Sequence, residues 1–225
     1  MGINMSLSPL WISLKVALCA TLFTFILGLL AARWVVSLKR GKAFLDGVFS
    51  LPMVLPPTVV GFFLLLLFGR NSLLGNLLLK LGIQVMFTWQ GAVIAAVVVS
   101  FPLMYRTARG ALEQVEQNLI YAARTLGMSE GKIFMRVVLP AAWPGIAAAT
   151  ILAFARALGE FGATAMIAGN IAGKTRTLPM AVYSEVAAGN MDAAYRYVVI
   201  IVVIAFLSVI LMNRAALREK KRRLS

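Results

Sequence analysis

Histidine is absent from the 225-residue sequence, cysteine occurs once, at Cys19, and only eight side chains are acidic. Without histidine, the chain lacks the commonest metal ligand and the commonest general base. A single cysteine excludes a disulfide within the chain, and we expect Cys19 to have a packing role. The nucleotide-binding pattern Gly-x-x-x-x-Gly-Lys-Ser/Thr is also absent, so the sequence predicts no ATP-hydrolysing site of its own.

Charged side chains are scarce as well, at 13%, whereas hydrophobic residues make up 61% of the chain and the mean hydropathy is +0.89. Soluble domains carry about 25% charged residues. The apolar residues gather in blocks near the length of about 20 residues that a helix needs to cross a bilayer. Backbone groups in lipid must be satisfied within their own segment, which favours helices. The predicted fold class is an all-α polytopic membrane protein.

About five transmembrane helices are expected, and the basic residues between them alternate in density. The predicted spans are Leu10–Val36, Gly47–Phe68, Gln90–Tyr105, Pro144–Ala168 and Ala193–Met212. The third is short enough to continue past Arg106. Basic residues are dense after the first, third and fifth spans, for example Lys39, Arg40, Lys132 and Arg136. The positive-inside rule then predicts a multi-pass protein with its N-terminus outside and its C-terminus in the cytoplasm.

The net charge of +14 could suggest a nucleic-acid partner. The basic residues flank the apolar blocks, where anionic lipid headgroups lie, so membrane lipid is the partner that the pattern favours. No nucleic acid is expected. Residues 214–225 form a short basic tail in this reading, on the cytoplasmic side.

The stretch between Arg106 and Trp143 is too polar to cross a membrane, yet it has helical periodicity. Apolar residues recur at helical spacing from Leu112 to Leu126. Gly127 is predicted to end this helix because glycine adopts a positive φ without steric cost. Ser129 is a candidate N-cap for a second helix, Glu130–Val138, which Pro140 is expected to stop. The pattern predicts a cytoplasmic pair of helices that needs lipid or a cytosolic partner to cover its apolar face.

These residues resemble the EAA loop of ATP-binding-cassette (ABC) importer permeases, through Tyr121-Ala122-Ala123, Gly127 and Val137-Val138-Leu139-Pro140. In that family the loop is a coupling helix that seats in a groove of the ATPase subunit. The sequence departs from the motif at Tyr121, where the motif has Glu. The resemblance implies a coupling loop over residues 112–140. Its candidate ATPase-coupling residues are Ala122, Ala123, Arg124, Thr125, Leu126, Gly127, Leu139 and Pro140.

The resemblance extends over nearly the whole chain and is greatest to the molybdate-importer permeases, in the type I importers. It rests on the segments 51–57, 59–61, 100–103, 122–127, 154–164, 169–171 and 174–179. The resemblance also implies a bacterial or archaeal cytoplasmic membrane as the location. It implies a type I permease domain over residues 10–213 that imports molybdate, with tungstate or sulfate and thiosulfate as alternatives. The implied partners are a second copy of the chain, two ATPase subunits and a periplasmic or lipid-anchored oxyanion-binding protein. No cofactor is expected on this chain, since ATP and Mg belong to the partner ATPase.

Glu160 is the only acidic residue inside a predicted span, and Arg156 precedes it by one helical turn. Side chains at i and i+4 share a helix face and can pair, which lowers the cost of burying either charge. The pair could lie beside the pathway or its gate, it could lock neighbouring helices together, or it could lie near the cytoplasmic interface. The prolines of the second span likewise suit a broken helix along the pathway or a packing kink. The candidate pathway or gate residues are Pro56, Pro57, Arg156, Gly159, Glu160, Gly162 and Thr164.

Two other classes of protein remain as alternatives. An autonomous ion-coupled carrier would need several titratable groups within the membrane, and Glu160 alone qualifies. A membrane enzyme would need a constellation of catalytic or metal-binding groups, which the sequence does not offer. A non-catalytic permease subunit is therefore the leading prediction.

Overall fold

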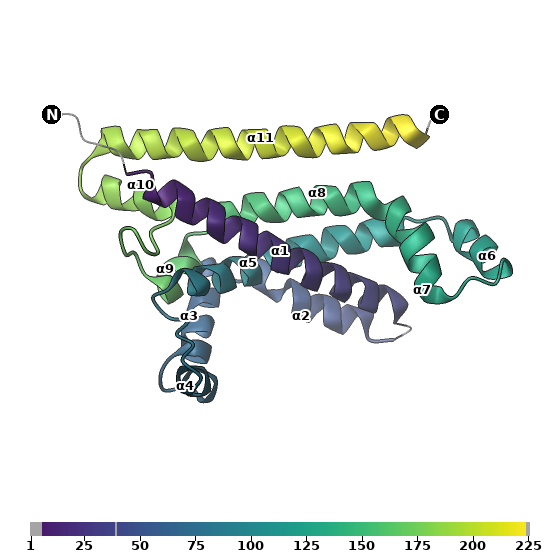
Figure 1. The fold of residues 1–225 in the computed structure, drawn as a ribbon, viewed down its shortest axis with the longest axis horizontal. Coiled ribbons are helices and arrows are strands. Elements are labelled where there is room, and N and C mark those ends of the chain that lie inside the picture. The colour runs from purple at the N-terminus through teal and green to yellow at the C-terminus, as the bar shows by residue number, and fades with distance from the viewer. Residues whose placement is uncertain (1–5, 39, 224–225) are drawn as a thin grey trace.

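The computed structural model describes residues 6–38 and 40–223, and its regular elements there are helices. Four long helices lie along one another as a bundle (Figure 1): α1 (Ser8–Ser37), α5 (Trp89–Glu113), α8 (Leu139–Leu158) and α11 (Met191–Arg223). Four stretches of the described chain are long and apolar enough to cross a bilayer, and a bent helix pair makes up to five. The predicted all-α polytopic fold is confirmed.

Short helices gather at the two ends of the bundle. The end where α1 begins carries α3 (Pro57–Phe68), α4 (Leu73–Lys80), α9 (Gly162–Ala168) and α10 (Leu178–Ala187) (Figure 1). The end where α11 finishes carries α6 (Gln117–Thr125), α7 (Glu130–Ile133) and a π-helical turn, η1 (Phe134–Val138). Helix α2 (Lys42–Val54) runs beside the bundle between the two ends.

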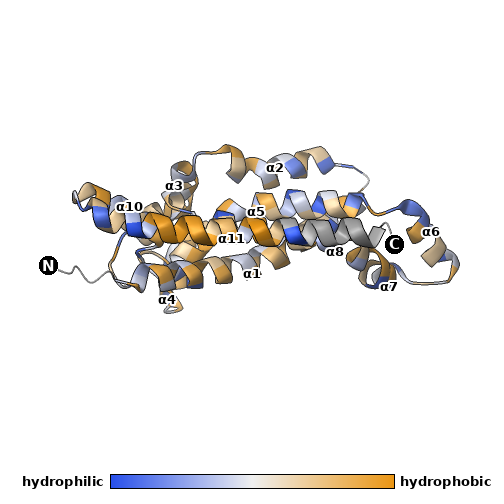
Figure 2. Cartoon of the chain, turned by 90° about the horizontal axis from the view of Figure 1, so that it is seen from above, coloured by the Kyte–Doolittle hydropathy of each residue, from blue (hydrophilic) through white to orange (hydrophobic). Residues whose placement is uncertain are grey.

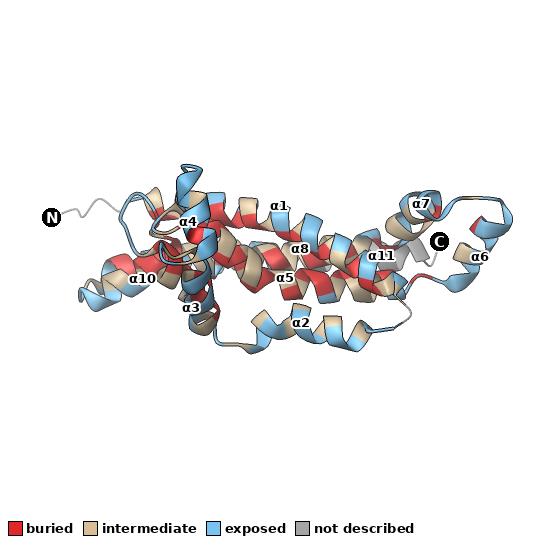
Figure 3. Cartoon of the chain, turned by 90° about the horizontal axis from the view of Figure 1, so that it is seen from below, coloured by how far each residue is buried: buried red, intermediate tan, exposed pale blue. Residues whose placement is uncertain are grey.

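The core of the bundle lies where α1, α5 and α8 meet, and buried residues follow these helices (Figure 3). Small residues permit the close approach, because helices in lipid associate through packing and interhelical hydrogen bonds. A Cβ added at Gly28 of α1 would lie 2.7 Å from Met104 Cγ of α5. Thr24 and Ser100 lie 3.2 Å apart, hydroxyl to hydroxyl, across the same two helices. The third span extends past Arg106, as its short predicted length allowed.

Helix α11 is different, since most of its apolar part is uncovered. The 22 residues Met191–Met212 are the most hydrophobic of the four long spans, and little of this stretch is buried. Figure 2 shows most of this stretch in orange. Phe206 is 63% exposed and Val202 is 58% exposed, as suits a surface that faces lipid acyl chains. The helix continues into the predicted tail as far as Arg223, while Leu224, Ser225 and Lys39 lie outside the described residues.

The second span is broken rather than continuous. Helices α2 and α3 meet at an angle of 106°, with Leu55 and Pro56 between them. Proline has no backbone N–H, and it disfavours the helical conformation in the residue before it. Pro57 begins α3, a position that tolerates the missing donor. The sequence prediction of a kink or break at these prolines is confirmed as a break.

The fourth predicted span, Pro144–Ala168, is wrong at both ends. A helical run begins at Glu130 and ends at Leu158, and α9 follows after a three-residue interruption. Pro140 does not stop the helix, because η1 widens the turn just before it. The Leu139 N–H donates to the Phe134 carbonyl five residues back. Pro140 has no N–H to donate to the preceding turn, and its ring would clash with a carbonyl of a regular α-helix. The wider π turn avoids both problems.

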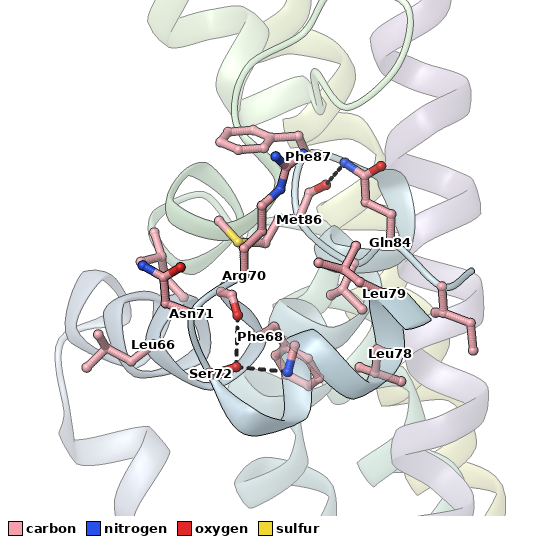
Figure 4. Close-up of a pocket in the computed structure, with 15 residues that line it drawn as sticks. Leu66, Phe68, Arg70, Asn71, Ser72, Leu78, Leu79, Gln84, Met86 and Phe87 are labelled. Carbon is pink, nitrogen blue, oxygen red and sulfur yellow. Dashed lines mark hydrogen bonds between the residues drawn. The ribbon is translucent and has the colours of Figure 1, made fainter. Parts of the chain in front are cut away.

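A hollow of about 600 Å³ lies between the end of α3, α4 and the loop that leads into α5 (Figure 4). Its walls are mainly apolar, with Leu66, Phe68, Leu78, Leu79 and Met86 among them. The Ser72 hydroxyl shapes this end, since it accepts a 2.8 Å hydrogen bond from the Gly75 N–H and caps α4. The hollow is at the opposite end of the bundle from α6.

Candidate functional site

The first candidate site is the hairpin formed by α6, α7 and η1. Its turn is built around Gly127, whose φ of +72° is in the left-handed region. The Met128 N–H donates to the Ala123 carbonyl at 3.2 Å, and the Gly127 N–H donates to the Arg124 carbonyl at 2.9 Å. This double closure is a Schellman motif, which requires a positive φ at the glycine. The predicted helix end at Gly127 is confirmed.

The other predicted helix limits of the hairpin are only partly right. The expected helix from Leu112 to Leu126 is two helices, because α5 ends at Glu113 and α6 begins at Gln117. The apolar periodicity spans this break because Leu112 and Val115 belong to the core of the bundle. Ser129 does occupy the N-cap position of α7, but its side chain makes no capping bond.

An ion pair joins the two arms of the hairpin. Arg124 Nε donates to Glu130 Oε1 at 2.7 Å, and its Nη2 donates to Oε2 at 3.2 Å. These hydrogen bonds, and then the charge of Glu130, raise the pKa of the Arg124 guanidinium. The pair is exposed, with 48% of the Arg124 side chain and 70% of the Glu130 side chain accessible. It is therefore accessible to a partner, and Arg124 already has an acidic neighbour within its own chain.

The surface of the hairpin is a candidate contact for a protein partner. Ala123 and Ile133 are buried inside it, at 5% and 1% exposure, and hold the arms together. Apolar side chains point outward beside them, namely Leu119, Tyr121, Leu126 and Met135. Ala122, Thr125 and Gly127 are also exposed. A cluster of exposed apolar side chains with a charged pair is typical of an interaction surface.

Two predicted coupling residues lie away from this surface. Leu139 packs against the core of the bundle, and Pro140 is exposed at the start of α8. The structure brings the six residues from Ala122 to Gly127 together and sets Leu139 and Pro140 on the returning helix. The coupling role of each remains a prediction.

The second candidate site is the interruption between α8 and α9. Arg156 Nη1 and Glu160 Oε2 are 2.8 Å apart, so the predicted pair forms. Glu160 is not within a helix, however, because α8 ends at Leu158. Its Oε1 accepts a 2.8 Å hydrogen bond from the Ala163 N–H in the first turn of α9. Glu160 is 3% exposed, and this second bond accounts for a buried carboxylate at a helix break.

Helix α9 packs tightly on α3, which follows the proline break. A Cβ at Gly61 of α3 would lie 2.8 Å from the Ala163 Cα, and one at Gly162 would lie 3.1 Å from the Pro57 Cβ. The structure therefore brings Pro57, Gly162 and Glu160 into one region, here named the break contact. It comprises residues 56–61 and 156–164.

The remaining predicted gate residues differ in their surroundings. Thr164 is 1% exposed within α9, whereas Pro56 and Gly159 are accessible. Two interrupted helices in contact within a membrane protein are tolerated where protein shields them or where they line a polar route. A role of these residues in a pathway or gate remains a prediction.

The structure contains a third polar cluster that the sequence did not predict. The Tyr105 hydroxyl and the Arg109 guanidinium both donate to Asp46 Oδ1, and Arg109 Nε donates to Glu113 Oε1 at 2.9 Å. Asp46 belongs to α2 and is one residue before the predicted second span. The spacing of Tyr105, Arg109 and Glu113 by four residues was the available signal, since such residues share a helix face. No sequence pattern near these residues indicates that they contact Asp46.

The comparisons with known proteins agree on one family. Residues 24–223 match the family described as "Binding-protein-dependent transport system inner membrane component". The chain is 44% identical over 214 residues to the molybdenum transport system permease protein ModB of Escherichia coli (strain K12), covering 94% of this chain and 93% of that protein. It is 35% identical over 213 residues to the sulfate transport system permease protein CysT of the same organism, covering 94% and 76%.

The fold also matches a solved structure. A chain of the MetNI methionine ABC transporter in an inward-facing conformation superposes with a TM-score of 0.76 at 20% identity, covering 97% of this chain and 99% of that one. Identity at this level supports the shared fold alone. The predicted type I importer transmembrane fold is confirmed.

Proposed function

The chain belongs to the inner-membrane components of binding-protein-dependent transport systems, and we propose that it forms the pathway for molybdate in an ABC importer. It is a multi-pass membrane protein and the permease, not the ATPase, of its system. The proposal of molybdate as the substrate rests on the 44% identity to ModB over nearly the full length of both chains. The 35% identity to CysT makes sulfate or thiosulfate the second candidate, and tungstate is chemically closest to molybdate.

The assembly in this proposal has two copies of the chain, two ATPase subunits and an oxyanion-binding protein. Up to five spans enclose little by themselves, so a pathway between two copies is physically reasonable. ATP and Mg are placed on the ATPase subunits, since the sequence has no phosphate-binding loop. Hydrolysis there would rock the two permease chains between inward-open and outward-open states.

The proposed orientation has the start of α1 outside and the end of α11 in the cytoplasm. The hairpin is at the same end of the bundle as the end of α11, and opposite the start of α1 (Figure 1). Arg124, Lys132 and Arg136 of the hairpin region and Arg33 near the end of α1 are basic, which favours the cytoplasmic side for this end. The hairpin would then face the ATPase, and α4 and α10 would face the binding protein.

The experiment that tests the function is the ATPase activity of the complete complex in proteoliposomes with its binding protein. Molybdate, tungstate and sulfate are compared at equal concentration, together with uptake of each. We expect molybdate to stimulate hydrolysis most, with ATP required for uptake. Greater stimulation by sulfate would assign the chain to the second candidate. Uptake driven by an ion gradient without an ATPase subunit would contradict an importer of this class.

A further inference from the structure

Helix α2 is held to the bundle along only one of its faces. None of its 13 residues is fully buried. Its outer face is uncovered, with Phe44 at 74%, Val48 at 48% and Leu51 at 53% exposure. Figure 3 shows α2 set apart from the bundle, without the buried residues that mark α5. A helix with so few buried contacts is free to move as a unit, provided that the contacts it does have can open.

Leu45 and Phe49 pack against the core from the inner face of α2, and Asp46 lies beside them. Phe49 meets the rings of Phe101 and Tyr105 edge-on, with centroids 5.5 Å and 5.1 Å apart. Asp46 is three residues earlier, so it lies on the same helix face. Its carboxylate accepts hydrogen bonds from the Tyr105 hydroxyl and the Arg109 guanidinium of α5. The polar contact is therefore the directional part of the attachment.

Arg109 links this attachment to the hairpin. Its Nε donates to Glu113 at 2.9 Å, and Glu113 is the last residue of α5. Residues 114–116 then lead directly into α6. A displacement of the hairpin that turns or unwinds the last turn of α5 must move Glu113, and Glu113 shares the Arg109 guanidinium with Asp46.

At its C-terminal end, α2 leads to the break contact. Val54 ends α2, and the chain passes through Leu55 and Pro56 into α3. Helix α3 packs on α9 through Gly61, where an added Cβ would lie 2.8 Å from the Ala163 Cα. Such close contact transmits movement because packed interiors are hardly compressible. The two candidate sites are thus joined through α2.

We propose that Asp46 and Arg109 form a latch that transmits movement of the ATPase-facing hairpin to α2, and that this latch opens and closes in each transport cycle. Both are positioning residues that act through α2, and neither is required to touch the transported anion. The proposal rests on the proposed function, because it assumes that an ATPase moves the hairpin.

The space needed for such a movement is present. A hollow of about 470 Å³ lies between α2 and α5, lined by the latch residues and by Gly47, Ser50, Arg106 and Gly110. A Cβ added at Gly47 or at Gly110 would meet no atom within 4 Å. The two helices are therefore separated beside the latch, and Asp46 and Arg109 join them across a gap.

The first test compares three substitutions in the complete complex with its ATPase and binding protein in proteoliposomes. Asp46→Asn and Arg109→Gln each remove one charge of the latch. Arg106→Gln is the matched control, since it removes a charge from the same helix and the same hollow, and Arg106 has no ion pair within the described residues. The quantity measured is the number of molybdate ions taken up per ATP hydrolysed.

We expect the two latch substitutions to lower this ratio at least fivefold, and the control to stay within twofold of the wild type. Amounts of assembled complex are compared in parallel, so that loss of folding is separated from loss of coupling. An unchanged ratio in both latch variants, or an equal loss in the control, would overturn the proposal.

The second test does not depend on removing the latch. Gly47→Cys and Gly110→Cys are introduced together in a Cys19→Ala background and joined with a short thiol cross-linker that a reductant cleaves. The added side chains have room, as the open space at both glycines indicates. We expect cross-linking to reduce uptake at least tenfold and cleavage to restore it. Full uptake while the two helices are joined would refute a moving latch.

The rate of cross-linking distinguishes this proposal from the proposed function. It is measured without any oxyanion, in the nucleotide-free complex and in the complex with a non-hydrolysable ATP analogue. We expect the rates to differ at least fivefold. Equal rates would overturn the latch even if molybdate uptake is normal, whereas a difference without molybdate uptake would support the latch and reject the substrate.

Discussion

Two Arg–Glu ion pairs, one in the hairpin and one in the break contact, have the same chemistry in opposite surroundings. In the hairpin, Arg124 and Glu130 are joined by two hydrogen bonds, and both side chains are exposed. In the break contact, Arg156 lies 2.8 Å from Glu160, whose side chain is 2% exposed. Each pair connects the two sides of a chain reversal or interruption.

The difference in burial determines what each pair can contribute. Exposed ion pairs are weakened by water and salt, so the hairpin pair adds little to folding and remains available to a partner. A buried carboxylate must have its partners, because an unpaired charge away from water is strongly unfavourable. Glu160 satisfies this requirement with Arg156 and with the Ala163 N–H. We expect the folding of the break contact to depend on each of its charged and polar groups. We expect the folding of the hairpin to tolerate loss of its ion pair.

The largest expected effect is at the glycine contact of the buried region. Gly61→Val places side-chain atoms where an added Cβ would already lie 2.8 Å from the Ala163 backbone. Overpacking of this kind costs about 1–3 kcal/mol, and the backbone contact puts this site at the upper end of that range. The measurement is the thermal melting of the purified chain in detergent. Gly131→Ala in α7, where a Cβ meets nothing within 4 Å, is the control, and equal melting temperatures for the two variants would contradict the comparison.

The second-largest effect is expected on anion uptake, when the carboxylates of the two ion pairs, Glu160 and Glu130, are replaced. Glu160→Gln keeps an acceptor for the Ala163 N–H and removes the charge that faces Arg156. Hydrogen bonds to charged groups contribute about 1.5–3 kcal/mol, and partial exposure of Arg156 lowers this value. We expect anion uptake in vesicles to fall about tenfold while assembly with the ATPase persists. Glu130→Gln is the matched change in the exposed pair and is expected to leave uptake within threefold. Unchanged uptake in Glu160→Gln would refute a gating role.

The third effect tests whether Arg124 contacts the ATPase or only Glu130. Arg124→Glu is expected to reduce transport-coupled ATP hydrolysis about threefold to tenfold, since it reverses a charge on the surface that we propose faces the ATPase. The double variant Arg124→Glu with Glu130→Arg restores an ion pair inside the hairpin but presents the opposite pattern to a partner. We expect hydrolysis to remain low in the double variant. Its recovery to the wild-type rate would show that Arg124 acts within the hairpin alone.

The smallest effect concerns two serines at helix starts. The Ser72 hydroxyl accepts from the Gly75 N–H at 2.8 Å, whereas the Ser129 side chain makes no such bond. Loss of an N-cap bond costs about 0.5–2 kcal/mol. We expect Ser72→Ala to speed amide hydrogen exchange in α4, and Ser129→Ala to leave α7 unchanged. Faster exchange in α7 would show that Ser129 does cap that helix in solution.

Much of this could be predicted from the sequence because the interactions involved are local. Long apolar blocks must form helices in lipid, so the number and rough position of the spans follow from composition. The turn at Gly127 could be predicted because the turn requires a positive φ, which glycine adopts without steric cost. The Arg156–Glu160 pair follows from a spacing of four residues, and it forms even though the helix ends between them.

The tertiary structure alone decided that the helical run continues through Pro140, that it ends before Glu160, and which distant groups meet. Pro140 is accommodated by a π turn, and Glu160 lies at the interruption before α9, which packs on α3. Asp46 reaches Arg109 across 63 positions of the chain, and no periodicity within either helix indicates that contact. Such contacts depend on how the helices pack, because bringing distant segments together requires many simultaneous interactions. The sequence by itself therefore determined the apolar blocks, the proline break and the turn at Gly127, and packing determined the limits of the fourth span, the buried carboxylate and the Asp46–Arg109 contact.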